Sequence, residues 1–221
     1  MRNITFILFL CVFSGILLGD NDKKQPFPNP FMLAHMQENA NYLESVIKLD
    51  SAKENYQTRE DKWLWLQAAL TYNSFIQNNP KSEIYNSAFY QPQDSVINCS
   101  LYDREAVDFL KEQITGNQLV IINEQHWHPK HRFLGNMLLE HFHKEGFRYL
   151  AVETIDKKDE YLLNQRKYPL QSSGFYTKEP NFGNFIRNAL QMGFEVIGYD
   201  TITANREYLQ AQRIYESTFQ K

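Results

Sequence analysis

The 221-residue sequence has only two cysteines, Cys11 and Cys99. Cys11 lies inside an apolar N-terminal run, so removal of that run on export would leave Cys99 without a partner. No internal disulfide can then form, even in an oxidising compartment. Packing must hold the fold, and a content of 43% hydrophobic and 14% aromatic residues is sufficient for a core.

A surplus of basic charge is also missing. The formal net charge is −3, the pI is about 6.1, and acidic and basic residues are mixed along the chain. Nucleic-acid binding requires a basic stripe that neutralises phosphates. We therefore expect no nucleic-acid partner and a small-molecule substrate or ligand instead.

The apolar run at residues 4–18 is too short for a comfortable membrane span. It follows Arg2 and precedes "GDNDKKQPFPNP", an order of charge, apolar run and polar segment that is typical of an export signal. We expect residues 1–19 to be a signal peptide, or an uncleaved anchor because Leu17 is large where a small residue is preferred. The protein is then periplasmic or secreted, and it meets a membrane only through this segment.

Residues 20–31 are rich in proline and predict an extended tether. Residues 32–92 predict a helical N-terminal subdomain, most clearly in "DKWLWLQAALTYNSFIQNNP", where Asn79-Pro80 is expected to end a helix. Trp63 and Trp65 could form a ligand platform, but aromatic residues at helical spacing are more often part of a core.

Residues 93–221 predict an α/β domain. Helical patterns at 103–116, 129–144 and 180–193 alternate with apolar strands at 119–122, 148–153 and 195–200. On the second helix, we expect the inner stripe to consist of Phe133, Leu134, Met137, Leu138 and Phe142. Strands that alternate with helices imply right-handed crossovers and a parallel sheet.

An internal repeat supports this fold class. The segments "EGFRYLAVET" and "MGFEVIGYDT" share Gly-Phe, a strand, an acid and a threonine, and Gly146 and Gly193 lie 47 residues apart (193 − 146). We expect a parallel sheet of repeated helix–strand units. Glu124, Glu153 and Asp200 would then stand at the carboxyl ends of their strands, where open α/β sheets bind ligands.

Five of the six histidines fall between His126 and His143. His126 comes two residues after Glu124, beyond a strand end, and we expect Glu153 close by. An imidazole oriented by a carboxylate can act as a general base, and a second carboxylate can hold the substrate or act as the acid. The alternative is that these carboxylates only cap the following helices.

The other histidines differ in position. His128 and His131 stand at the entry of a helix, where they could either cap it or line the site. His141 and His143 are two residues apart and point in different directions, which favours surface positions. "HWHPKH" also contains His-x-His, which is similar to the first motif of amidohydrolase and PHP-type barrels. Any metal would use His126, Glu124 and Glu153, but those families need later histidines, and none follows His143.

The segment "INEQHWHPKHRFLGNMLLEHFHKEGFRYLAVET" resembles the superfamily of erythromycin-esterase-like proteins, ChaN-like haem-binding lipoproteins and TraB/Tiki proteins. The resemblance covers about residues 103–221. It implies that Glu124 and His126 form the first family motif, with His126 as the base, and that Glu153 belongs to the second. "NREYLQAQRIYE" is similar to the family's arginine-rich helix and brings in Arg206.

Two features depart from this pattern. Asn123 stands where the family usually has glycine. The chain stops at "STFQK" in helical register, before the further strand and second functional histidine that such proteins usually carry, so we expect a C-terminally truncated chain or a diverged member.

The sequence thus predicts an exported hydrolase acting on ester bonds, in which His126, Glu124 and Glu153 activate water. His128, His131, Asp200 and Arg206 are expected to bind the substrate. The alternatives are a haem- or other ligand-binding envelope protein without catalysis, and a Tiki-like hydrolase that depends on a divalent metal.

Overall fold

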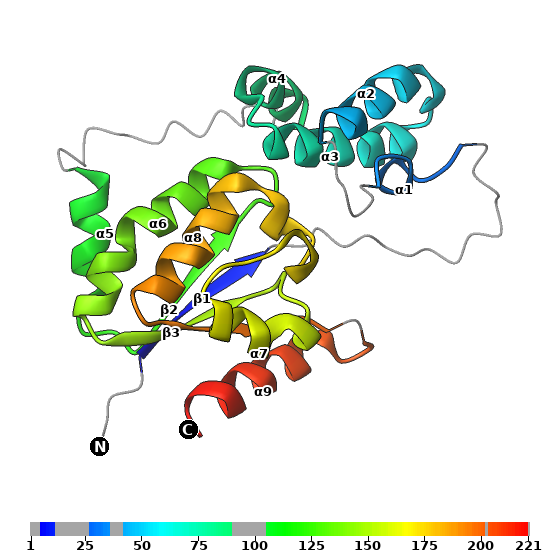
Figure 1. Ribbon diagram of the computed structural model, residues 1–221. Helices are drawn as coiled ribbons and strands as arrows, with labels where there is room; N and C mark the ends of the chain where they lie inside the picture. Colours follow the sequence, from blue (N-terminus) through cyan, green and yellow to red (C-terminus); the bar gives the residue numbers. More distant parts are fainter. Residues whose placement is uncertain (1–4, 12–26, 36–41, 90–104, 202, 221) are drawn as a thin grey trace. The chain divides into compact units, whose positions relative to one another are not determined.

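The computed structural model describes residues 5–11, 27–35, 42–89, 105–201 and 203–220. The chain divides into two units, one made of Met1–Val12 with Ile97–Lys221 and the other of Phe13–Val96. The first unit is mixed α/β, as predicted, and the described part of the second is helical (Figure 1). Cys99 and the tether as far as residue 26 lie outside the described residues.

Within the described residues, the first unit contains one sheet of four parallel strands. They are β1 (Thr5–Cys11), β2 (Leu119–Glu124), β3 (Phe147–Val152) and β4 (Glu195–Gly198), in the order β2-β1-β3-β4. In the register, Ile7 of β1 is opposite both Val120 of β2 and Leu150 of β3. Part of the run with the pattern of an export signal is therefore a strand inside the sheet.

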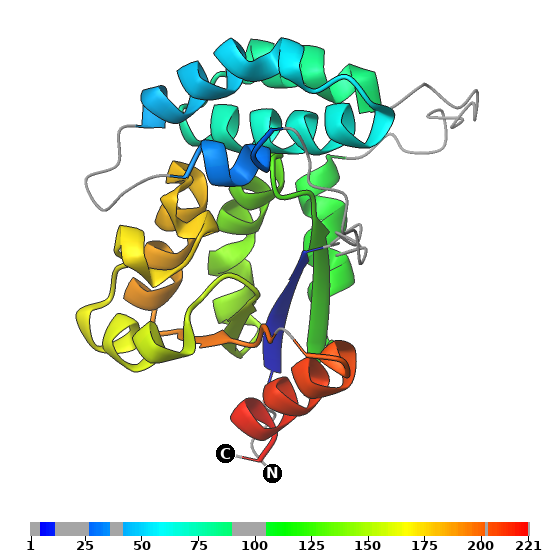
Figure 2. The same cartoon turned by 90° about the vertical axis from the view of Figure 1, so that its right-hand side faces the viewer.

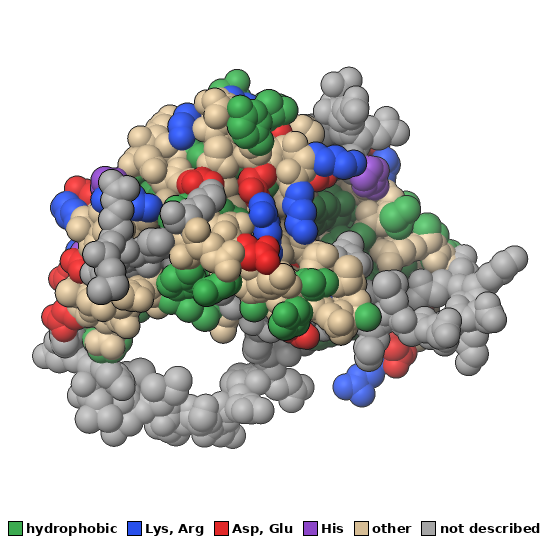
Figure 3. Space-filling view, turned by 90° about the horizontal axis from the view of Figure 1, so that it is seen from below, with side chains coloured by type: hydrophobic (Ala, Val, Ile, Leu, Met, Phe, Trp, Pro, Cys, Tyr) green, Lys and Arg blue, Asp and Glu red, His purple; other side chains and the backbone are tan. Residues whose placement is uncertain are grey.

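Helices lie on both faces of this sheet (Figures 1 and 2). On one face, α5 (Ala106–Ile114), α6 (Pro129–Lys144) and α8 (Pro180–Gln191) share a core with the sheet. On the other face, Ile214 of α9 (Arg206–Thr218) packs against Ala151 and Ile197. On the side that carries α9, basic side chains stand beside acidic ones (Figure 3).

Local signals explain where α6 and α8 begin and end. Each helix has proline at its first position, Pro129 or Pro180, where the missing N–H costs no hydrogen bond. Each is followed by a glycine with positive φ, 95° at Gly146 and 96° at Gly193, which the left-handed turn into the next strand favours. The buried face of α8 is apolar and follows helical spacing: Phe182, Phe185, Ile186, Ala189 and Leu190.

The predicted inner stripe of α6 is partly wrong. Phe133 and Met137 are 56% and 47% exposed, whereas Arg132 is completely buried. The buried stripe consists of Pro129, Arg132, Gly135, Leu138, Leu139 and Phe142. A charged residue takes a core-facing position here, so the true stripe is rotated relative to the one that apolar residues alone would indicate.

The outer edge of β4 is covered by α7 (Lys157–Arg166). The side-chain amide of Asn164 donates to the carbonyl of Val196 at 2.8 Å and accepts from its N–H at 2.9 Å. Glu160 accepts from the N–H of Gly198 at 2.7 Å. Side chains of α7 thus pair with backbone groups that a neighbouring strand would otherwise use.

The second unit contains α1 (Pro30–Leu33), α2 (Tyr42–Ala52), α3 (Arg59–Phe75) and α4 (Asn79–Phe89). The prediction that Asn79-Pro80 ends a helix is wrong, because α3 already ends at Phe75. Asn79-Pro80 instead opens α4, since proline suits the first turn of a helix. Trp65 is buried and donates from its ring to the carbonyl of Leu49 at 2.9 Å, as a core residue would. None of the described helices is long and apolar enough to cross a membrane.

Candidate functional site

A buried ion pair lies at the carboxyl end of β2. Glu124 is the last residue of the strand, and Arg132 projects toward it from the second turn of α6. The arginine donates from Nε to Oε2 at 2.7 Å and from Nη2 to Oε1 at 2.8 Å, so it contacts both carboxylate oxygens. Neither side chain is exposed. Such a bidentate pair fixes the orientation of the carboxylate.

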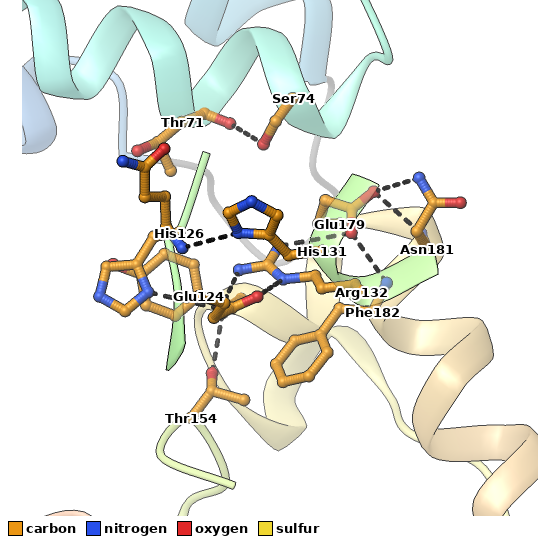
Figure 4. A network of polar contacts seen from close by, with 12 residues as sticks. Thr71, Ser74, Glu124, His126, His131, Arg132, Thr154, Glu179, Asn181 and Phe182 are labelled. Atoms are coloured by element: carbon orange, nitrogen blue, oxygen red, sulfur yellow. Dashed lines mark hydrogen bonds and ion pairs between the residues drawn. The ribbon is translucent and has the colours of Figure 1, made fainter. Parts of the chain in front are cut away.

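Glu179 extends this pair into a network. It precedes Pro180 and caps α8, where its side chain accepts from the N–H of Asn181 at 2.9 Å and of Phe182 at 2.8 Å. Arg132 Nη1 also donates to its Oε2 at 3.3 Å. The glutamate is completely buried, and its carboxylate lies between the first N–H groups of α8 and the guanidinium of Arg132. The network therefore joins β2, α6 and α8 (Figure 4).

The charge of Arg132 determines the ionisation of Glu124. Burial raises the pKa of this carboxyl group, but the positive charge of Arg132 and the contacts with His126 and Arg132 outweigh burial and lower the pKa to about 2. The guanidinium also lies 4.6 Å from the ring centre of Phe182 and 5.5 Å from that of Tyr176. Glu124 is consequently an ionised acceptor at neutral pH.

His126 contacts this fixed carboxylate. Its Nδ1 lies 3.6 Å from Oε1 of Glu124, and its ring stacks on Tyr176 with the ring centres 4.2 Å apart and the planes at 15°. Tyr176 is itself held, because its N–H donates to the hydroxyl of Thr154 at 2.9 Å. The carboxylate favours a hydrogen on Nδ1, which leaves the lone pair on Nε2. This is the orientation that a general base requires.

Close backbone contact holds the segment that carries Tyr176. Ile155 pairs with Gly174 in an isolated bridge, and a Cβ on Gly174 would lie 1.9 Å from the carbonyl oxygen of Thr154. A residue with a side chain would therefore displace the backbone here. This close backbone contact holds the segment from which the Tyr176 ring stacks on His126.

His131 differs from His126, because its Nδ1 faces a hydrogen-bond donor and not a carboxylate. The N–H of Gln125 donates to its Nδ1 at 3.2 Å, and its ring stacks on that of His128 with the centres 4.9 Å apart. Burial lowers the pKa of His131; the charge of Arg132 also lowers it, against the opposing effect of Glu124. Both predicted substrate-binding histidines thus stand beside the Glu124–His126 pair.

The other predicted residues form a second cluster. Arg206 contacts Glu153 and donates to Oδ1 of Asp200 from Nε at 3.1 Å and from Nη2 at 2.9 Å. Gln210 donates to the same oxygen at 2.8 Å. Burial alone would lower the pKa of Arg206, but the hydrogen bonds and charges of Asp200 and Glu153 raise it. Asp200 and Arg206, both predicted to bind substrate, thus form an ion pair with each other.

Strand alternation separates the two clusters. Glu124 shares its side of β2 with Val120 and Ile122, which pack on the α6–α8 core. Glu153 follows Val152, and alternation along β3 gives it the side of Ala151, which packs with α9. The three strand-end acids do stand at one edge of the sheet. Their side chains, however, belong to clusters on opposite faces.

The metal interpretation gains no support from this geometry. In the part of the chain that the structure describes, no three histidine, cysteine, aspartate or glutamate side chains are grouped as a metal site. Arg132 already occupies both oxygens of Glu124. His141 is half-buried and lies away from the site, where its ring contacts the carbonyl of Lys111 at 2.9 Å.

Sequence reasoning missed Arg132, Glu179 and Tyr176. Arg132 had one usable signal: it is a charged residue in register with the buried face of its helix, three residues before Gly135 and seven before Leu139. Glu179 had another, since an acid directly before a helix-opening proline is a candidate cap. We see no sequence signal for Tyr176, because its place depends on backbone contact with distant residues.

Comparison of the chain with family models, with curated proteins and with solved structures gave no match.

Proposed function

We propose that this protein is a hydrolase in which His126 is the general base that activates water. The observation that carries the proposal is the position of His126 Nδ1, 3.6 Å from a carboxylate that Arg132 holds by two hydrogen bonds. His126 is also buried, and the electrostatic attraction between its ring N–H and a fixed carboxylate is stronger there than in water.

The reaction we propose is ester hydrolysis of the erythromycin-esterase type. Nε2 of His126 takes a proton from water while the water oxygen attacks the carbonyl carbon. The tetrahedral intermediate collapses, the bond to the leaving oxygen breaks, and that oxygen receives the proton from His126. Glu124 orients the ring and stabilises its cationic form, as a carboxylate does for a catalytic histidine. The products are a carboxylic acid and an alcohol.

We assign Glu153, Asp200 and Arg206 a supporting role at the same edge of the sheet. Their mutual contacts hold the start of α9 against the ends of β3 and β4. Arg206 is 33% exposed and could meet a substrate group from there. Water activation in this proposal rests on Glu124 and His126.

We further propose that α6–β3 and α8–β4 are copies of one helix–strand unit. The similar φ angles of Gly146 and Gly193, 95° and 96°, support this, as does the parallel pairing of β3 with β4. An exported, periplasmic or secreted location also remains our proposal, and it is supported by the order of charge, apolar run and polar segment at residues 1–19.

The test is hydrolysis of a panel of model esters and lactones. We expect His126→Gln to lower kcat by about 10²–10⁴, which is the contribution of a positioned general base. The matched control is His141→Gln on α6, which should hydrolyse at the wild-type rate. Equal rates for His126→Gln and wild type would remove His126 from the mechanism.

A ligand-binding role is the second candidate, because an oriented Nε2 lone pair on His126 suits haem iron as well as a proton. Haem titration separates the two functions. A visible absorption band that disappears in His126→Gln and persists in His141→Gln would favour haem binding. Metal analysis of untagged, active protein tests the Tiki-like variant, since activity with an empty site excludes it.

A further inference from the structure

His126 and His131 lie at the same edge of the sheet but face opposite kinds of partner. Nδ1 of His126 faces the carboxylate of Glu124, whereas Nδ1 of His131 accepts the backbone N–H of Gln125 at 3.2 Å. A ring nitrogen that accepts a hydrogen bond carries a lone pair, so the hydrogen of neutral His131 must be on Nε2. We therefore expect the two histidines to be opposite tautomers.

The second nitrogen of His131 points away from Arg132 and Glu124 (Figure 4). Three ionisable groups face this ring: Glu124 from the end of β2, Arg132 from α6, and His128, which stacks on it. Burial and the charge of Arg132 oppose protonation of the ring, and Glu124 favours it. The outcome is a lowered pKa and a neutral imidazole at neutral pH.

We propose that His131 donates a hydrogen bond from Nε2–H to the carbonyl oxygen of the substrate, as the partner of His126 in ester hydrolysis. This inference rests on the proposed function. When the water oxygen attacks, the electron pair of the carbonyl π bond moves onto that oxygen, and a donor already in place stabilises the negative charge. The pair returns when the leaving oxygen departs, and His131 keeps its proton throughout.

The same geometry argues against His131 as a metal or haem ligand. Ligation through Nε2 would require the ring hydrogen on Nδ1, where it would face the N–H of Gln125. Ligating histidines instead direct their second N–H at an acceptor. Of the two residues, His126 meets that condition and His131 does not.

The first experiment determines the His131 tautomer in the full chain labelled with ¹⁵N-histidine. Long-range ¹H–¹⁵N spectra at neutral pH should show an unprotonated Nδ1 and a protonated Nε2, and His131→Gln identifies the signals. An unprotonated Nε2, or protonation of both nitrogens, would overturn the inference whatever the activity of the protein.

The second experiment uses the model ester that wild type hydrolyses fastest. We expect His131→Leu to lower kcat by about 10²–10³ with a smaller change in KM, as for loss of one oxyanion donor. His131→Gln, which keeps an N–H donor, should recover part of that loss, and His141→Gln should be unaffected. Equal kcat for His131→Leu and wild type would reject the donor role and leave His126 as the base.

If wild type hydrolyses none of the esters, a phosphonate monoester becomes the probe, because its oxygens resemble those of the tetrahedral intermediate. A shift of the His131 Nε2 signal on titration, with binding lost in His131→Leu, would support the donor role although the hydrolase proposal had failed. The absence of any shift would overturn it.

Discussion

Arg132 binds both carboxylate oxygens of Glu124, at 2.7 and 2.8 Å, and neither side chain is exposed to solvent. A buried pair of this kind contributes little net stability, because removing both charges from water offsets their attraction. The pair instead fixes the orientation of the carboxylate that His126 contacts. Loss of one partner, by contrast, leaves a buried charge.

Arg132→Met should therefore destabilise the protein by about 3–5 kcal/mol. Urea unfolding measures this, and the double variant Glu124→Gln/Arg132→Met is the matched control. The double variant should lose less stability than Arg132→Met alone, because no carboxylate is left uncompensated at position 124. A single variant as stable as wild type would mean that the pair is open to water.

Acid should weaken the fold through Glu124. Its pKa in the folded protein is about 2, below the usual value of 4.5. A lowered pKa gives stability that is fully present above pH 4.5 and is lost as the pH falls toward 2. Unfolding free energies measured between pH 6 and about pH 3 should fall more steeply in wild type than in Glu124→Gln/Arg132→Met. Parallel curves would contradict the assigned pKa.

The edge of β4 offers a third prediction. Asn164→Ala removes both hydrogen bonds to the backbone of Val196, at 2.8 and 2.9 Å. We expect a loss of about 1–3 kcal/mol, from backbone groups left without their partner. We also expect stronger self-association in sedimentation experiments, because an uncovered edge can pair with another chain. Gln165→Ala, the exposed neighbour, should match wild type in both measurements.

The N-terminal run has two interpretations that one experiment can separate. As an export signal it is removable, yet β1 (Thr5–Cys11) pairs with both β2 and β3. If β1 belongs to the folded protein, a chain that begins after Gly19 should unfold at lower urea concentration than the full chain. Equal stability, together with a mature N-terminus after Gly19 in exported material, would assign the run to export alone.

The sequence allowed the helix–strand alternation to be predicted because its signals are local. Pro129 and Gly146 bracket α6, Pro180 and Gly193 bracket α8, and the buried face of α8 follows from helical spacing. Strand ends then located Glu124 and the residues after it. Each of these inferences needs only a few neighbouring residues.

The missed features depend on long-range contacts. Arg132 is buried only because Glu124 and Glu179 meet it, and Glu179 lies 47 residues further along the chain. Strand alternation, which assigns Glu124 and Glu153 to different faces, depends on the register of β2 and β3. The apolar run at residues 4–18 was ambiguous for another reason, since export signals and buried strands both require consecutive apolar residues.

We propose that Glu124 orients His126 with its lone pair on Nε2. Long-range ¹H–¹⁵N spectra of wild type determine the tautomer of His126, with His126→Gln as the assignment control. We predict a protonated Nδ1 and an unprotonated Nε2, and a loss of this preference in Glu124→Gln. A hydrogen on Nε2 of wild-type His126 would contradict the claim.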